Sequence, residues 1–278
     1  MSGTYLVSHV ECAALSDIVL PVIGEGWSKV LKGIDASMNA TVYAANLRTQ
    51  GVTFIGRYYT NLAATRRPEK ALTPREAHDL SQAGFSLVAV WELLATPGYF
   101  NGNQGFADGQ YAYKYALEMI RQPEDSAIYF AVDFDASQIV FEQAVVPYFR
   151  GVAEAFASAS GNRPLYSVGV YGSGAVCAAL KQNGLARYSW MSQSMGWQGS
   201  RTYQDWDIRQ GPTVGDPAFQ FDEDIAKDEF GAFRVSFENT APLFAINTEM
   251  ADAEHKLSVT EGDSRQERFS DFRYISAF

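Results

Sequence analysis

Two aspartates end a strand-like segment near the middle of the chain. The segment reads Ile128-Tyr-Phe-Ala-Val-Asp-Phe-Asp-Ala, and strand side chains alternate between two faces. Asp133 and Asp135 therefore share one face with Tyr129 and Ala131, opposite an entirely apolar face. An unpaired buried carboxylate is costly, so we expect a partner or a function to hold Asp133 in its apolar strand. Asp135 also fits a cap of the following loop or helix.

Three further acids stand near the ends of predicted strands. They are Asp35, Glu92 and Asp222. Asp35 also suits an Asx-turn or a helix N-cap, and Glu92 also suits a loop-facing position. Carboxylates crowded at one rim raise the pKa of one another, so that one can donate a proton while a second stays ionised. Glycoside hydrolysis uses this arrangement.

Aromatic and polar side chains accompany these acids. Rings at a strand end suit a sugar substrate, because the apolar face of a sugar stacks on them, although each ring also fits ordinary core packing. The aromatic candidates are Tyr58, Trp91, Tyr171 and Trp190. The polar candidates for substrate contact are Arg57, Gln210 and Gln220.

Short apolar segments that alternate with helical ones must position these residues. We expect strands at 32–38, 52–60, 85–94, 127–135, 167–173, 187–194, 206–211 and 218–225. Helical patterns lie between them, and the clearest begins with Thr73 as N-cap, Pro74 at the first position and Glu76 completing a capping box.

Eight strands with interleaved helices predict an α/β fold with a parallel sheet. Eight units in about 200 residues favour a closed (β/α)8 TIM-type barrel over a doubly wound open sheet. Residues 196–217 have the composition of a loop, so the last units are expected to be irregular. In a closed barrel the first and last strands are neighbours, which would bring Asp35 beside Asp222.

The chain divides into three parts. We expect an N-terminal extension at 1–31, the barrel at 32–235, and an acidic tail or appendage at 236–278. The last part holds eight acids against four Lys or Arg residues and lacks clear periodicity.

Composition excludes several function classes. The 278 residues carry a formal net charge of −10, which argues against nucleic acid and against anionic lipid as partners. No apolar run approaches the roughly 18 residues of a membrane span, so no membrane insertion is expected. The first residues lack a positive n-region, and Glu11 and Asp17 interrupt their apolar stretch, so we expect no secretory signal peptide and synthesis in the cytoplasm.

Metal and disulfide chemistry is not expected either. Cys12 and Cys177 are too few for a disulfide framework; one bridge between them is an alternative, but we expect two free thiols. The histidines, His9, His78 and His255, are scattered without the spacing of a zinc site. We therefore expect neither a metal nor an organic cofactor.

The order of the motifs resembles one family. The motifs are Gly33-Ile-Asp-Ala-Ser, Tyr129-Phe-Ala-Val-Asp-Phe-Asp-Ala, Gly169-Val-Tyr-Gly-Ser, Trp190 and Gln220-Phe-Asp. Over about residues 32–235 they resemble the glycoside-hydrolase-like domain family called domain of unknown function 1906. That family is in turn similar to the family-25 glycoside hydrolases, the lysozyme-type muramidases. The resemblance implies a (β/α) barrel with a groove for peptidoglycan glycan strands.

The resemblance also implies roles for individual residues. Asp35, Asp133 and Asp222 match the aspartates of the muramidases, and Asp135 stands in the place of the general-acid glutamate. Aspartate is one methylene shorter, so its carboxyl lies about 1.5 Å further back, and misplacement on that scale can cost on the order of 100-fold in rate. Either the substrate sits deeper, or Glu92 is the acid, or activity is weak or absent.

Three functions follow from this resemblance. The first is a peptidoglycan-directed glycoside hydrolase that cleaves the MurNAc–GlcNAc β-1,4 bond. The second is a weak or inactive glycan-binding barrel used in wall remodelling or targeting, which the Asp-x-Asp departure favours. The third is a delivered antibacterial effector with the chemistry of the first. It would reach the periplasm or cell wall by dedicated export, and a secretion-system or immunity protein would be its partner.

Overall fold

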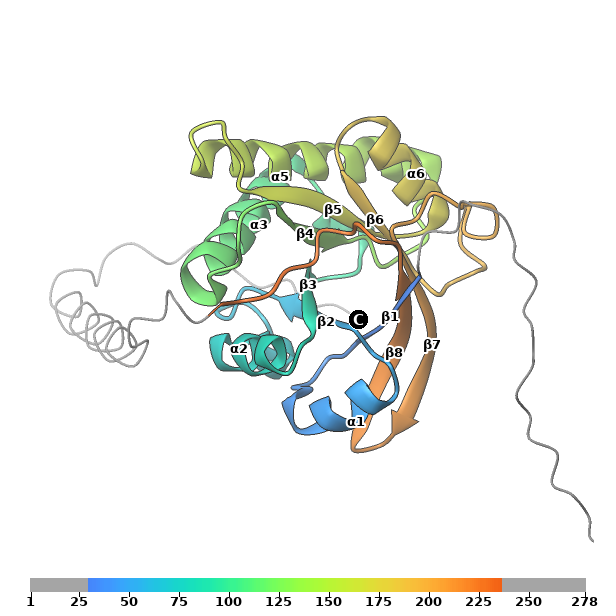
Figure 1. Ribbon diagram of the computed structural model, residues 1–278. Coiled ribbons are helices and arrows are strands. Elements are labelled where there is room, and N and C mark those ends of the chain that lie inside the picture. Colours follow the sequence, from blue (N-terminus) through green and yellow to red (C-terminus); the bar gives the residue numbers. More distant parts are fainter. Residues whose placement is uncertain (1–29, 237–278) are drawn as a thin grey trace, which may run out of the picture.

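The computed structural model describes residues 30–236. The expected extensions at 1–31 and 236–278 lie outside these residues except for their innermost positions, as do Cys12, His9 and His255. Eight strands close a barrel in sequence order (Figure 1). They are β1 (Leu31–Asp35), β2 (Phe54–Tyr59), β3 (Ser86–Trp91), β4 (Ser126–Ala131), β5 (Tyr166–Gly172), β6 (Tyr188–Met191), β7 (Ile208–Asp216) and β8 (Phe219–Ala226).

Helical segments connect the first six strands. They are η1 (Thr41–Tyr43), α1 (Ala44–Thr49), η2 (Pro68–Lys70), α2 (Pro74–Gln82), η3 (Pro97–Tyr99), α3 (Gly102–Lys114), η4 (Tyr115–Ile120), α4 (Gln138–Val140), η5 (Phe141–Val145), α5 (Val146–Ala159) and α6 (Gly174–Gln182). Among residues 30–236, no helix combines the length and apolar character needed to cross a membrane.

The last two strands depart from a TIM-type barrel. Strands β1 to β7 pair in parallel, but β8 runs antiparallel to both β7 and β1. A two-residue connection after Asp216 forces this direction, because a parallel crossover needs a dozen or more residues. Asp216 accepts hydrogen bonds from the backbone N–H groups of Ala218 and Phe219, which holds the turn. The expected closed barrel is confirmed, and its last units are irregular as expected: within residues 30–236 no helix follows β6 or β7, and β8 is antiparallel.

The side chains of the strands form two apolar layers, as their alternation predicts. Ile128 and Phe130 of β4 pack in the outer layer, between the barrel and its helices. Tyr129 packs in the inner layer with Phe54 and Trp190. Asp133, just beyond β4, and Asp222, within β8, therefore lie at the rim of a filled barrel rather than of an open pore.

Helices α3 and α5 lie side by side on the outside of the barrel (Figure 1). Their backbones approach closely because glycines face the contact. A Cβ on Gly105 would overlap the carbonyl oxygen of Tyr148, and a Cβ on Gly151 would overlap that of Gly102.

We expect Gly105→Ala to destabilise the barrel by about 1–3 kcal/mol, because the two helices must separate to admit a methyl group. Urea denaturation followed by circular dichroism measures the change. Gly98→Ala is the matched control, since within the described chain nothing lies within 4 Å of a Cβ added at Gly98. Equal stability of the two variants would contradict the close packing of α3 on α5.

Candidate functional site

Asp35 and Asp222 stand side by side at the mouth of the barrel. They are register partners across β1 and β8, as expected for the first and last strands of a closed barrel. Asp224, two residues further along β8, lies on the same face, and both Asp35 and Asp224 are buried. Three carboxyl groups therefore gather between two neighbouring strands.

Gln210 of β7 joins this group. Its Nε2 donates to Asp35 Oδ2 at 2.7 Å and to Asp222 Oδ2 at 3.0 Å. Its Oε1 accepts from the Tyr171 hydroxyl at 2.9 Å and from the backbone N–H of Gln193 at 3.2 Å. A backbone N–H can only donate, so the oxygen of the amide must face Gln193. The amide NH2 is thereby fixed toward the carboxylates.

Burial decides the protonation of the two deeper acids. It raises the pKa of Asp35 from 3.8 to about 7; the nearby charge of Asp222 adds to this effect, while hydrogen bonds from Gln210 and Tyr58 oppose it. Burial and the charge of Asp35 raise the pKa of Asp224 well above its usual value, against the hydrogen bond that Trp190 Nε1 donates at 2.9 Å. The mouth therefore holds protons on carboxyl groups near neutral pH.

This burial predicts a pH-dependent stability. Raising the pKa of Asp35 from 3.8 to about 7 means that its stabilising contribution is complete below about pH 4 and is lost as the pH rises through 7. Asp35→Asn removes that loss, so the variant should match the wild type near pH 4 and exceed it by up to about 4 kcal/mol near pH 8. Urea denaturation at several pH values measures the difference. A difference that stays constant over this range would show that Asp35 does not titrate there.

Asp133 and Glu92 form the other side of the mouth. Asp133 is half-buried, and its pKa is raised by burial and by the charges of Glu92 and Asp222, against the attraction of Lys70. Glu92 Oε2 lies 3.1 Å from Lys70 Nζ. Lys70 Nζ in turn lies 4.0 Å from the centre of the Tyr58 ring, and the Tyr58 hydroxyl donates to Asp35 Oδ1 at 3.3 Å. A line of contacts thus joins Glu92 to the deeper acids.

Two expected site residues lie at the surface. Asp135 is exposed, and its Oδ1 accepts from the backbone N–H of Gln198 at 2.9 Å. Its carboxylate therefore holds the loop after β6, as its alternative role as a loop cap predicts. Gln220 is exposed on the β7–β8 hairpin, paired with Gly215 beyond the level of Asp222.

Two others point away from the mouth, which corrects their expected role in substrate contact. Arg57 is fully buried outside the barrel wall, where it forms an ion pair with Glu76. Trp91 is buried in the outer layer, 6.1 Å from Tyr111 between ring centres. The reason is alternation: Tyr58 and Val90 take the inward positions of β2 and β3, so Arg57 and Trp91 must face the helices.

The remaining aromatic candidates face the barrel interior. Tyr171 is half-buried and meets Trp190 edge-on, with ring centres 5.7 Å apart. Trp190 is buried, so its role is to support the acids through Asp224. Asp224 and Lys70 were not predicted from the sequence, although Asp224 shares a strand face with Asp222 and alternation marks it. Among the described residues, no group of three His, Cys, Asp or Glu side chains is placed to hold a metal ion.

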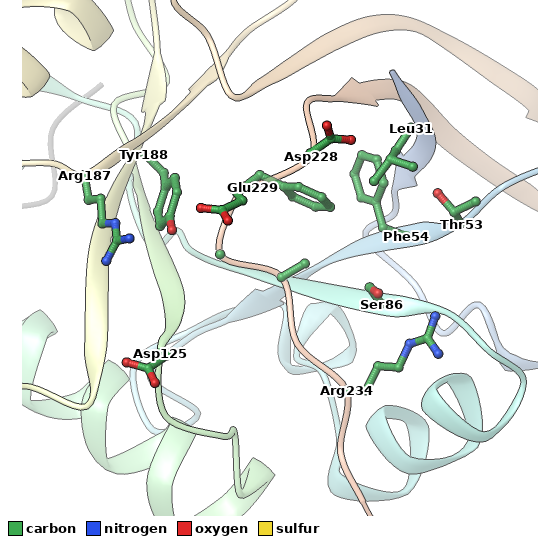
Figure 2. A pocket seen from close by; sticks show the side chains of 13 residues that line it. Leu31, Thr53, Phe54, Ser86, Asp125, Arg187, Tyr188, Asp228, Glu229 and Arg234 are labelled. Carbon is green, nitrogen blue, oxygen red and sulfur yellow. The ribbon is translucent and has the colours of Figure 1, made fainter. Parts of the chain in front are cut away.

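A cavity lies at the end of the barrel opposite the mouth, where the parallel strands begin (Figure 2). Its volume is about 600 Å³. The charged side chains around it are Asp125, Arg187, Asp228, Glu229 and Arg234. It shares no residue with the carboxylates of the mouth.

Comparison with known proteins agrees with the motifs. The model of the "Rv2525c-like, glycoside hydrolase-like domain" family matches residues 45–228. Uncharacterized protein FadG of Bacillus subtilis is 30% identical over 191 residues, which cover 66% of this chain and 32% of FadG. YbfG of the same organism is 32% identical over 166 residues, 58% of this chain and 22% of YbfG. The matched region thus spans a third or less of either relative.

A solved structure shares the fold. The Mycobacterium tuberculosis Tat-secreted protein Rv2525c, in complex with HEPES, superposes with a TM-score of 0.61 at 19% sequence identity. The superposition covers 72% of this chain and 98% of that one.

Proposed function

The chain belongs to the Rv2525c-like, glycoside hydrolase-like domain family predicted from its motifs, and from this premise we propose that it hydrolyses the MurNAc–GlcNAc β-1,4 bond of peptidoglycan. The observation that supports this most is the mouth itself. The pKa of Asp133 is raised, and the charge of the nearby Asp222 contributes to this shift. Both residues lie at the rim where barrel enzymes build their sites. Such a pair supplies a proton donor and a carboxylate together.

The proposed mechanism assigns each acid one task. Asp133 donates its proton to the glycosidic oxygen as the bond to the anomeric carbon breaks. Asp222, which accepts hydrogen bonds from Gln210 Nε2 and Thr213 Oγ1, stabilises the positive charge that develops on the sugar. The acetamido oxygen of the substrate, or water directly, attacks the anomeric carbon. Water supplies the hydroxyl group of the product, and the proton that this water releases restores the acid form of Asp133. Asp35 positions Gln210 and Tyr58.

Asp133 is preferred to Asp135 as the proton donor because of where their carboxyl groups lie. A general acid needs a raised pKa and access to the leaving oxygen. Asp133 combines a raised pKa with a half-buried position at the mouth. Asp135 is exposed and engaged with Gln198. Glu92, in its ion pair with Lys70, raises the pKa of Asp133 rather than donating a proton itself.

One observation favours a second function. Asp135 occupies the place of the family-25 glutamate, yet it is shorter and holds a loop. A barrel without that acid would bind glycan without cleaving it. Binding to peptidoglycan would then serve wall remodelling or targeting.

Digestion of purified peptidoglycan, with mass spectrometry of the soluble products, tests the proposal. If the chain hydrolyses the MurNAc–GlcNAc bond, the soluble products should be muropeptides that end in reducing MurNAc. Asp133→Asn should release none of them at the wild-type rate. Glu154→Gln, which removes an exposed carboxylate from α5, is the control for the loss of one negative charge in Asp133→Asn. Retention on peptidoglycan without product release would establish the binding barrel instead.

Action on peptidoglycan implies export. Rv2525c is a Tat-secreted protein. For this chain we propose that it acts in the periplasm or cell wall, and delivery as an antibacterial effector is one route. Fractionation of cells that produce a tagged chain tests this location, and retention of all the protein in the cytoplasm would contradict it.

A further inference from the structure

A smaller cavity of about 250 Å³ opens beside the carboxylates. It lies beyond the carboxyl ends of β2 and β3, under the loop that joins β2 to α2. Its lining residues are Tyr58, Thr60, Thr65, Arg67, Lys70, Glu92 and Leu93. Tyr58 also donates to Asp35, so the cavity adjoins the site described above.

Cations outnumber acids in this cavity. Arg67 and Lys70 line it against a single acid, Glu92. The ion pair of Arg67 with Glu69 is exposed on both sides, at 61% and 56% of the side chains, and such pairs exchange readily. Lys70 Nζ carries three N–H donors and uses one of them in its hydrogen bond to Glu92. Both cations therefore have donors for a further anion.

Thr60, one of the residues that line this cavity, carries a buried hydroxyl group without a hydrogen-bond partner in the described part of the chain. Thr60 is 3% exposed, and its Oγ1 makes no hydrogen bond within residues 30–236. Buried polar groups are nearly always paired, because an unpaired one costs free energy. A ligand that accepts a hydrogen bond at this point would satisfy it.

The charge of the mouth explains why such a cavity is useful. The negative charges of Glu92 and Asp222, which raise the pKa of Asp133, would repel an anionic substrate. A substrate whose anionic group enters a cationic cavity to one side avoids that repulsion, and it is oriented at the same time.

We propose that this cavity is a subsite for a carboxylate carried by the glycan, held by Arg67, Lys70 and the Thr60 hydroxyl. In glycan strands from which the stem peptide has been removed, the lactyl group of MurNAc carries such a carboxylate, whereas the attached peptide converts it to an amide. The inference rests on the proposed function, because it names the chemical group by which that site selects its substrate.

Binding of the disaccharide GlcNAc–MurNAc, measured by titration calorimetry, tests the subsite against the methyl ester of the same disaccharide. The disaccharide lacks the bond proposed to be cleaved, so hydrolysis does not interfere. We expect the wild type to prefer the acid by about ten-fold, the range of one hydrogen bond to a charged group. Arg67→Gln and Thr60→Val should each bring this preference to within about two-fold.

The matched control is Arg150→Gln, which removes an exposed cation from α5 and should keep the full preference. Arg67→Lys should keep most of it, which separates loss of charge from damage to the loop. Equal affinity of the wild type for acid and ester would overturn the subsite and leave the glycan function standing. Failure of the wild type to bind either sugar would overturn both.

Discussion

Replacing Asp133 by Asn is expected to slow the release of muropeptides by about 100- to 10,000-fold, which is the usual contribution of a general acid. Asn has nearly the same shape and cannot donate the proton that the leaving oxygen requires. The fold should remain intact, because burial and the charges of Glu92 and Asp222 already disfavour the ionised form of Asp133. Rates of product release, with melting temperatures measured on the same preparations, give both quantities.

Asp135→Asn discriminates between the two assignments of the acid. Its carboxylate accepts from the Gln198 N–H, a bond that an Asn oxygen can also accept, so activity should stay within about five-fold of the wild type. Loss of activity in Asp135→Asn with retention in Asp133→Asn would place the acid where the family resemblance puts it. An Asp133→Asn chain that fails to fold would make Asp133 structural.

A mouth with this many acids is a costly feature of the fold. The barrel holds part of the cluster in the protonated form, since burial raises the pKa of Asp35 and Asp224. It gives the remainder donors, through Gln210 and Thr213 to Asp222 and through Lys70 to Glu92. Such prearranged dipoles need no reorganisation when charge develops on a substrate, which is how enzyme sites gain most from electrostatics.

Strand alternation and the order of the strands predict much of the geometry of the mouth. They placed Asp133 on the inward face of its strand and brought Asp35 beside Asp222. The direction of β8 differs from the prediction because β7 extends to Asp216, and the two residues left before β8 are too few for a parallel crossover.

Alternation also explains the errors at single residues. Arg57 and Tyr58 are adjacent in one strand, so both could not face the mouth. Asp224 follows Asp222 by two positions and had to share its face. Lys70 could not be predicted, because a residue of η2 reaches Tyr58 and Glu92 only through the folded path of the β2–α2 connection.

Arg57 acts on stability instead, and its loss should have the largest effect on the fold. Its guanidinium donates to both Glu76 oxygens, at 2.8 and 3.1 Å, and to the carbonyl of Ala36. Glu76 Oε1 also accepts a hydrogen bond from the Ala40 N–H at 3.1 Å, so the Glu76 carboxylate turns away from Thr73. Of the two hydrogen bonds of the predicted capping box, the structure has the one from the Glu76 N–H to Thr73 Oγ1. This ion pair ties β2, α2 and the loop after β1 together.

Arg57→Met should therefore cost about 3–5 kcal/mol, because it leaves the Glu76 carboxylate buried and unpaired. For a chain of this size the melting temperature should fall by between about 6 and 20 °C. Arg75→Met on the same helix is the matched control. Arg75 pairs with Asp79 while 83% of its side chain is exposed, so its loss should cost less than about 0.5 kcal/mol.

The double variant Arg57→Met with Glu76→Met decides whether the cost comes from the orphaned charge. Removing both partners leaves no buried charge, and a buried ion pair replaced by apolar groups of similar volume is often close to neutral. The double variant should thus be more stable than Arg57→Met alone and far more stable than the two single effects would give in sum. Additive losses would instead mean that Arg57 stabilises the barrel through its bond to Ala36 and its packing, with the ion pair contributing little.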